Sequence, residues 1–280
     1  MLKTVTTING RFVDRRNARI SVFDNSLLYA EGLFETFLAI DDRIIFIEGH
    51  LKRLYRGARV IGLEIPASPE KLTAWMRKTV RAHPDRITKL RLTLTAGEAA
   101  RWVGRQGRPQ VILSASPHTM PTQPYTLHVS RFRVDHKSVF RRIKTLSYAI
   151  HAAALGQARK ANCDDALMLN QNDQVAEVTS ANIYWVERGH IYTPPITSGC
   201  LEGVTRKTVL KEARKLGYII AEKNCSLARL LKADEVFISS SLKLVVGVSV
   251  IKIGRKGHRL ATGGITSQLR EHFYRLVDLH

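Results

Sequence analysis

Two ionisable residues in the second half of the chain stand in local sequences that could support covalent chemistry. Lys144 lies in the run RRIKTL (141–146), after an extended segment and just before a predicted helix. Glu177 opens a predicted strand in the run AEVTSAN (176–182). A lysine ε-amine can form a Schiff base with an aldehyde and can later move a proton at a neighbouring carbon. A carboxylate can hold a protonated ring nitrogen.

Two predicted anion sites follow these residues along the chain. Gly203, Val204 and Thr205 open a predicted helix, where unpaired backbone N–H groups and the helix dipole favour a phosphate. Ser239–Ser241 forms a predicted turn that adds hydroxyl groups. A pyridoxal 5′-phosphate site requires a lysine for the aldehyde, a carboxylate for the ring nitrogen and N–H groups for the phosphate. The pattern is compatible with this cofactor.

Other common catalytic and metal motifs are absent from the sequence. It contains no GxGxxG after a strand, no phosphate loop ending in Gly-Lys-Ser/Thr, no HExxH and no GxSxG. The ten histidines lack metal-ligand spacing, so no metal site is predicted. Cys163, Cys200 and Cys225 are too far apart for a zinc site and are odd in number, which is typical of thiols in a reducing cytoplasm.

The elements that must position these residues are mainly strands flanked by helices in each half of the chain. This pattern predicts an α+β fold of two domains. Three prolines interrupt residues 116–124, so we predict a small domain at 1–115, a linker at 116–124 and a larger domain at 125–280. The larger domain contains the predicted strand Glu177–Val186 and the predicted helix Thr205–Leu216.

The composition bears on whether the chain spans a membrane, is exported or binds nucleic acid. The chain has 280 residues, 44% hydrophobic, with 44 Lys+Arg against 24 Asp+Glu, a net charge of +20. A mean hydropathy of −0.13 and the absence of a long apolar run predict no membrane span, and the first residues predict no signal peptide. A pI near 10.3 is compatible with nucleic-acid binding. The basic residues are dispersed, however, so we predict a solvated basic surface and no nucleic-acid partner.

Nearly the whole chain resembles the class IV aminotransferases, the fold type IV family of pyridoxal-phosphate enzymes. This family includes branched-chain aminotransferases, D-amino-acid aminotransferases and 4-amino-4-deoxychorismate lyase. The matching runs, in chain order, are ING (8–10), DNSLLYAEGLFET (24–36), HLKRL (50–54), IKTL (143–146), DALMLN (165–170), EVTSAN (177–182), YTP (192–194), LEGVTR (201–206) and ADEVFI (233–238).

The resemblance implies a role for particular residues of this chain. It implies that Lys144 is the Schiff-base lysine, that Glu177 binds the pyridinium nitrogen and that Arg53 binds the cofactor phosphate. It also implies that four further residues bind the phosphate: Val204, Thr205, Ser240 and Ser241. The family's fold has two domains, each a mainly antiparallel sheet or barrel with flanking helices, with the cofactor in the cleft. The resemblance also implies a homodimer.

The reaction depends on the residues that face the substrate. Tyr29 is implied to point into the site, and Arg101 falls where the lyase places a carboxylate-binding arginine, although many aminotransferases in the family also use an arginine from this loop. Trp102 is a candidate for the pocket wall. Ser240 replaces an asparagine of the lyase, and the KAGGNY-like run of branched-chain enzymes is absent after Lys144. We therefore expect transfer of an amino group between an amino acid and a 2-oxo acid, with the lyase reaction as the alternative.

Overall fold

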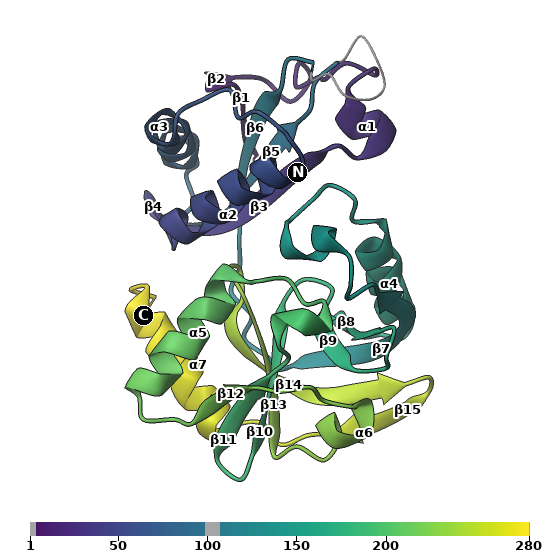
Figure 1. Cartoon of the computed structure of the whole chain (residues 1–280). Coiled ribbons are helices and arrows are strands. Elements are labelled where there is room, and N and C mark those ends of the chain that lie inside the picture. Colours follow the sequence, from purple (N-terminus) through teal and green to yellow (C-terminus); the bar gives the residue numbers. More distant parts are fainter. Residues whose placement is uncertain (1–3, 99–106, 280) are drawn as a thin grey trace. The chain divides into compact units, whose positions relative to one another are not determined.

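The computed structural model describes residues 4–98 and 107–279, which divide into two compact units (Figure 1). The first unit contains Met1–Met120 and Ile143–Ser147, and the second contains Pro121–Arg142 and Tyr148–His280. The chain thus passes to the second unit inside the proline-rich stretch. It then returns the segment that carries Lys144 to the first unit.

An antiparallel sheet with the strand order β2-β1-β6-β5-β3-β4 forms the first unit. Its strands are β1 (Val5–Ile8), β2 (Arg11–Phe12), β3 (Gly32–Ile40), β4 (Arg43–Ile44), β5 (Ile87–Thr95) and β6 (Gln110–Pro117). The helices of this unit are α1 (Asn25–Tyr29), α2 (Ile47–Val60) and α3 (Pro69–Arg81). Strands β1 and β2 pair antiparallel as a hairpin, with Thr7 opposite Phe12 and Ile8 opposite Arg11.

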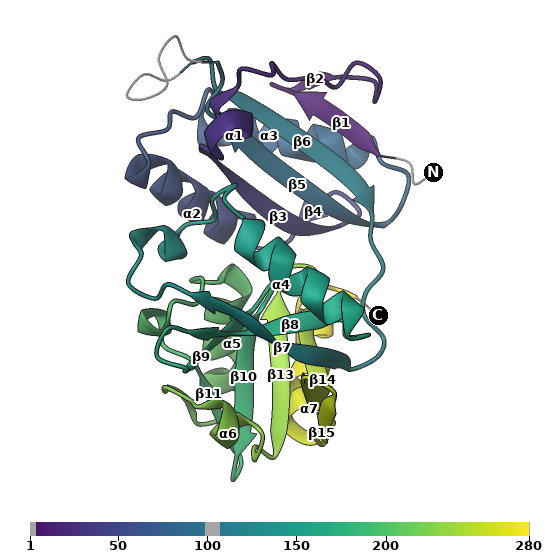
Figure 2. The same cartoon turned by 90° about the vertical axis from the view of Figure 1, so that its right-hand side faces the viewer.

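The core of the first unit lies between one face of this sheet and helices α2 and α3 (Figure 2). Because side chains alternate along a strand, Leu33, Glu35 and Phe37 of β3 point to the same face. Leu33 and Phe37 belong to the apolar cluster that α2 and α3 cover. Glu35 is therefore a carboxylate on the core face of the sheet, where a charge requires polar partners.

A mixed sheet with the order β12-β11-β10-β13-β14-β7-β8-β9 forms the second unit, and β15 pairs with β14. Its strands are β7 (Tyr125–Val134), β8 (Asp165–Asn170), β9 (Val175–Val178), β10 (Asn182–Glu187), β11 (His190–Thr193), β12 (Ile220–Glu222), β13 (Glu235–Ser240), β14 (Leu244–Ile253) and β15 (Lys256–Arg259). The helices are η1 (Val139–Arg142), α4 (Ala149–Lys160), η2 (Ile196–Ser198), α5 (Val204–Lys215), α6 (Leu227–Leu230) and α7 (Gly264–Leu276).

The prediction of one strand over Glu177–Val186 is wrong, because the chain reverses after β9. The side chain of Asp165 stabilises this turn by hydrogen bonds. Its Oδ1 accepts hydrogen bonds from the amide and the hydroxyl of Thr179, and its Oδ2 accepts one from Ser180 Oγ at 2.5 Å. Short polar side chains of this kind favour turns over strands. Glu177 therefore lies one residue before the end of β9, next to a tight turn.

None of the helices in the described part of the chain combines the length and the apolar character needed to cross a membrane.

Candidate active site

Lys144 is held by backbone pairing with the start of β3. The Phe34 amide donates to the Lys144 carbonyl at 2.9 Å, and the Leu146 amide donates to the Gly32 carbonyl at 2.9 Å. A side chain at Gly32 would approach Leu94 O to 2.5 Å and Leu146 Cδ1 to 2.6 Å, so glycine allows this close packing. The position of Lys144 is thus set by the backbone and not by its own side chain.

The ammonium group of Lys144 lies over an aromatic ring. Its Nζ is 4.3 Å from the centre of the Phe34 ring, and the guanidinium carbon of Arg91 is 4.1 Å from the same centre. The side chain of Lys144 is half-buried. Contact with the negative ring face orients the amine. Breaking this contact so that the amine can move costs only about 1 kcal/mol.

Arg53 forms a buried ion pair on the helix side of the same sheet. Its Nε donates to Glu35 Oε1 at 2.7 Å and its Nη2 to Glu35 Oε2 at 2.6 Å, while His50 Nδ1 lies 2.7 Å from Oε2. Burial would raise the pKa of Glu35, but Arg53 and His50 outweigh it and lower this pKa to about 2. Burial lowers the pKa of His50, so His50 binds Glu35 as the neutral imidazole.

The remaining predicted residues of the first unit are those assigned to the substrate. Tyr29 is the last residue of α1, and half of its side chain is exposed. Ser26 ties this short helix to the sheet, because its Oγ donates to Glu31 O at 2.7 Å and accepts from the Ala96 amide at 2.8 Å. Arg101 and Trp102 lie outside the described residues.

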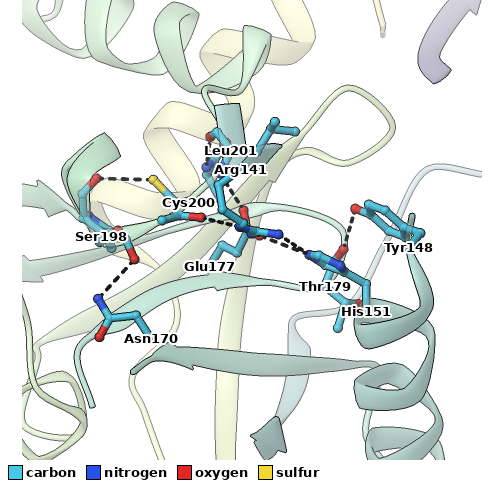
Figure 3. A network of polar contacts seen from close by, with 12 residues as sticks. Arg141, Tyr148, His151, Asn170, Glu177, Thr179, Ser198, Cys200 and Leu201 are labelled. Carbon is cyan, nitrogen blue, oxygen red and sulfur yellow. Dashed lines mark hydrogen bonds and ion pairs between the residues drawn. The ribbon is translucent and has the colours of Figure 1, made fainter. Parts of the chain in front are cut away.

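Glu177 is the centre of a polar network in the second unit (Figure 3). Its Oε1 accepts a hydrogen bond from Arg141 Nη2 and lies 3.2 Å from His151 Nε2. Its Oε2 accepts from the Leu201 amide at 2.8 Å. Burial would raise the pKa of Glu177, whereas Arg141, His151 and Leu201 lower it, to about 2. Glu177 is therefore an ionised carboxylate although only 4% of it is exposed.

The predicted phosphate site lies at the N-terminus of α5. A side chain at Gly203, the residue before this helix, would collide with Asn182 Oδ1, while Asn182 Nδ2 donates to Leu201 O at 2.8 Å. Val204 and Thr205 are buried in the first turn, whose N–H groups have no partner within the helix. Ser240 ends β13 and Ser241 follows it, both half-buried.

The second unit retains polar groups that fit a bound cofactor. Thr205 Oγ1 is buried and has no hydrogen-bond partner among the described residues. It lies at the positive end of the α5 dipole, where a phosphate would satisfy it. An ionised carboxylate accepts about four hydrogen bonds, and Glu177 receives three from described residues. One position on Oε2 is left for a ring N–H. These residues fit pyridoxal phosphate.

The sequence pattern did not identify the residues that orient Arg53 and Glu177. Glu35 and His50 fix Arg53, and Arg141 and His151 fix Glu177. The sequence does indicate that Glu35 is buried, because strand alternation places it on the core face with Leu33 and Phe37. No comparable pattern marks Arg141 as the partner of Glu177.

Comparison with known proteins places this fold and these motifs in one family. The family model described as amino-transferase class IV matches residues 32–251. The chain belongs to the class IV aminotransferases, and the expected class of enzyme is thereby confirmed.

The relatives extend over almost the full length of the chain. A protein of Methanocaldococcus jannaschii, provisionally named a branched-chain-amino-acid aminotransferase, is 33% identical over 95% of this chain and 94% of its own length. A D-alanine aminotransferase of Bacillus licheniformis is 29% identical over 87% of each chain.

A solved structure confirms the predicted fold type. The branched-chain aminotransferase of the thermophilic archaeon Thermoproteus uzoniensis, solved with norvaline, superposes with a TM-score of 0.90 at 29% identity, covering 98% of this chain and 94% of the other. Two α+β units with mainly antiparallel and mixed sheets are therefore the fold type IV architecture that the sequence predicted.

Proposed function

We propose that this chain is a pyridoxal-phosphate-dependent aminotransferase that moves an amino group between an amino acid and a 2-oxo acid. The observation that carries the cofactor assignment is the buried, unpartnered hydroxyl of Thr205 in the first turn of α5. When bound, pyridoxal phosphate supplies an aldehyde that takes up the amino group and a ring that delocalises the electrons released at Cα. Family membership supports the reaction class.

Each predicted residue has a defined task in this proposal. Lys144 holds the cofactor aldehyde and then, as the free amine, moves the proton at the substrate Cα. Glu177 accepts a hydrogen bond from the ring nitrogen and keeps it protonated. The phosphate is bound by Arg53, Val204, Thr205, Ser240 and Ser241.

The substrate is bound by a separate set of residues. Arg101 binds a carboxylate of the substrate by charge-assisted hydrogen bonds. Tyr29 and Trp102 contact its side chain. These three residues determine which amino acid enters, because the cofactor chemistry is the same for every amino donor.

A spectroscopic panel tests the reaction. Addition of single L- and D-amino acids to the cofactor-loaded protein should convert the bound cofactor to its amine form, and a 2-oxo acid should reverse the change. Absence of conversion across both series would contradict the aminotransferase. Pyruvate release from aminodeoxychorismate would instead establish the lyase alternative. A purified chain that binds no cofactor would contradict both.

We also propose that the protein is a homodimer in the cytoplasm. Around α1 the surface exposes large apolar side chains: Val22 (64%), Phe23 (63%), Leu27 (60%), Leu28 (50%) and Tyr29 (50%). Monomeric soluble proteins rarely expose contiguous apolar patches of this kind, and a second copy of the chain would cover them. The three buried free thiols support a reducing compartment.

Leu27→Glu is expected to convert the dimer to a monomer, because a charge in the centre of an apolar interface must lose its hydration. Light scattering after gel filtration measures the mass. Leu216→Glu, which alters an exposed leucine of the second unit, is the matched control and should remain dimeric. A monomeric mass for the unsubstituted chain would contradict the proposal.

A further inference from the structure

The donors around Glu177 differ between its two carboxylate oxygens. Arg141 Nη2 and His151 Nε2 both approach Oε1, whereas Oε2 receives only the Leu201 amide from the described residues. Each carboxylate oxygen offers two acceptor positions. Oε1 is therefore fully used, and a further donor can bind Glu177 only at Oε2.

Arg141 is itself fixed by several contacts, as Figure 3 shows. Its Nε donates to the Gly199 carbonyl at 2.8 Å, and its Nη1 lies 3.3 Å from His151 Nε2. Its side chain is 19% exposed. Because His151 Nε2 donates to Glu177, it does not also accept from Nη1. The planar guanidinium group is thus held at two nitrogens, Nε by Gly199 and Nη2 by Glu177, so the direction from which it approaches Glu177 is set by its surroundings.

His151 is held by an aromatic neighbour. Its ring stacks on Tyr148 with centroids 4.2 Å apart and an interplanar angle of 15°, and the Tyr148 hydroxyl donates to Thr179 O at 3.0 Å. Thr179 belongs to the turn that follows Glu177. Donors from η1, from α4 and from the segment before α5 therefore surround one carboxylate on β9.

We propose that Arg141 is a positioning residue for the cofactor ring. Together with His151 it occupies Oε1 of Glu177 and so makes Oε2 the oxygen that binds the pyridine nitrogen. It also supplies the positive charge that allows a carboxylate to remain ionised in a buried position. This inference rests on the proposed function, since it concerns how Glu177 meets the ring.

The test compares two aldehydes that differ only at the ring nitrogen. Apoprotein is titrated with pyridoxal phosphate and with 1-deazapyridoxal phosphate, in which a C–H replaces the nitrogen, and both dissociation constants are measured by absorbance. Native protein should prefer pyridoxal phosphate. Arg141→Met should reduce this preference about tenfold, as expected for loss of a charge-assisted contact. Glu177→Gln should do the same, and the double variant should lose no more.

Controls separate positioning from general stability. Arg141→Lys, which keeps the charge, should restore most of the preference, and Arg131→Gln, an exposed arginine of the same unit, should leave it unchanged. If Arg141→Met does not fold, His151→Gln provides the measurement and should reduce the preference by a smaller factor. Equal weakening of both aldehydes, or no weakening, would overturn the inference while leaving the proposed function intact. Failure of native protein to bind either aldehyde would overturn both.

Discussion

Lys144→Ala is expected to lower the rate of amino transfer by more than about a thousandfold. The lysine provides both the amine that holds the cofactor and the base that moves the Cα proton, and a positioned acid–base group alone contributes about 10²- to 10⁴-fold. The fold should persist, because the backbone around Lys144 pairs with β3 regardless of the side chain. Single-turnover absorbance with a reactive amino acid measures the rate.

Loss of the contact between Lys144 and Phe34 should change stability by only about 1 kcal/mol. Lys89→Ala is the matched control, since Lys89 is an exposed lysine on β5 of the same unit. The control should retain the native rate. A Lys144→Ala variant within tenfold of the native rate would exclude Lys144 as the catalytic amine.

The sequence allowed prediction of the residues that belong to short local runs. Lys144 and Glu177 were candidates from their local runs, and the resemblance to the class IV aminotransferases implied their roles and that of Arg53 in the HLKRL run. The helix predicted over Thr205–Leu216 is confirmed as α5, whereas the single strand predicted over Glu177–Val186 is wrong. The catalytic and binding roles of the three residues stay predictions, whereas the fold they belong to is confirmed.

The contacts that tune these residues could not be predicted, because they join positions far apart in the chain. The turn after β9 depends on Asp165, and the carboxylate of Glu177 depends on Arg141 and His151. Local propensity does not contain such tertiary pairs. The partial exception is Glu35, since its core-facing register and the i, i+3 spacing of His50 and Arg53 on one helix face together indicate a buried ion pair.

That buried pair gives the largest expected effect on stability. Glu35→Gln should lower the free energy of unfolding at pH 7 by about 3 kcal/mol or more, because it leaves the buried guanidinium of Arg53 without its counter-charge. It should also weaken binding of inorganic phosphate or the cofactor, since Arg53 loses the two contacts that orient it. Chemical denaturation measures the first effect and titration of the apoprotein the second.

The same substitution should change the dependence of stability on acid. The pKa of Glu35 is about 2 in the folded chain against an ordinary value of 4.5. The stabilisation by this carboxylate is therefore complete above pH 4.5 and is lost as the pH falls towards 2, a contribution of about 3 kcal/mol. Glu35→Gln should remove this part of the acid sensitivity. Glu48 is an exposed carboxylate in the first turn of α2 and provides the control. Glu48→Gln should change stability by less than about 1 kcal/mol and should keep the acid sensitivity of the native chain. Equal acid sensitivity in the Glu35 variant and the native chain would show that the ion pair with Arg53 does not stabilise the first unit.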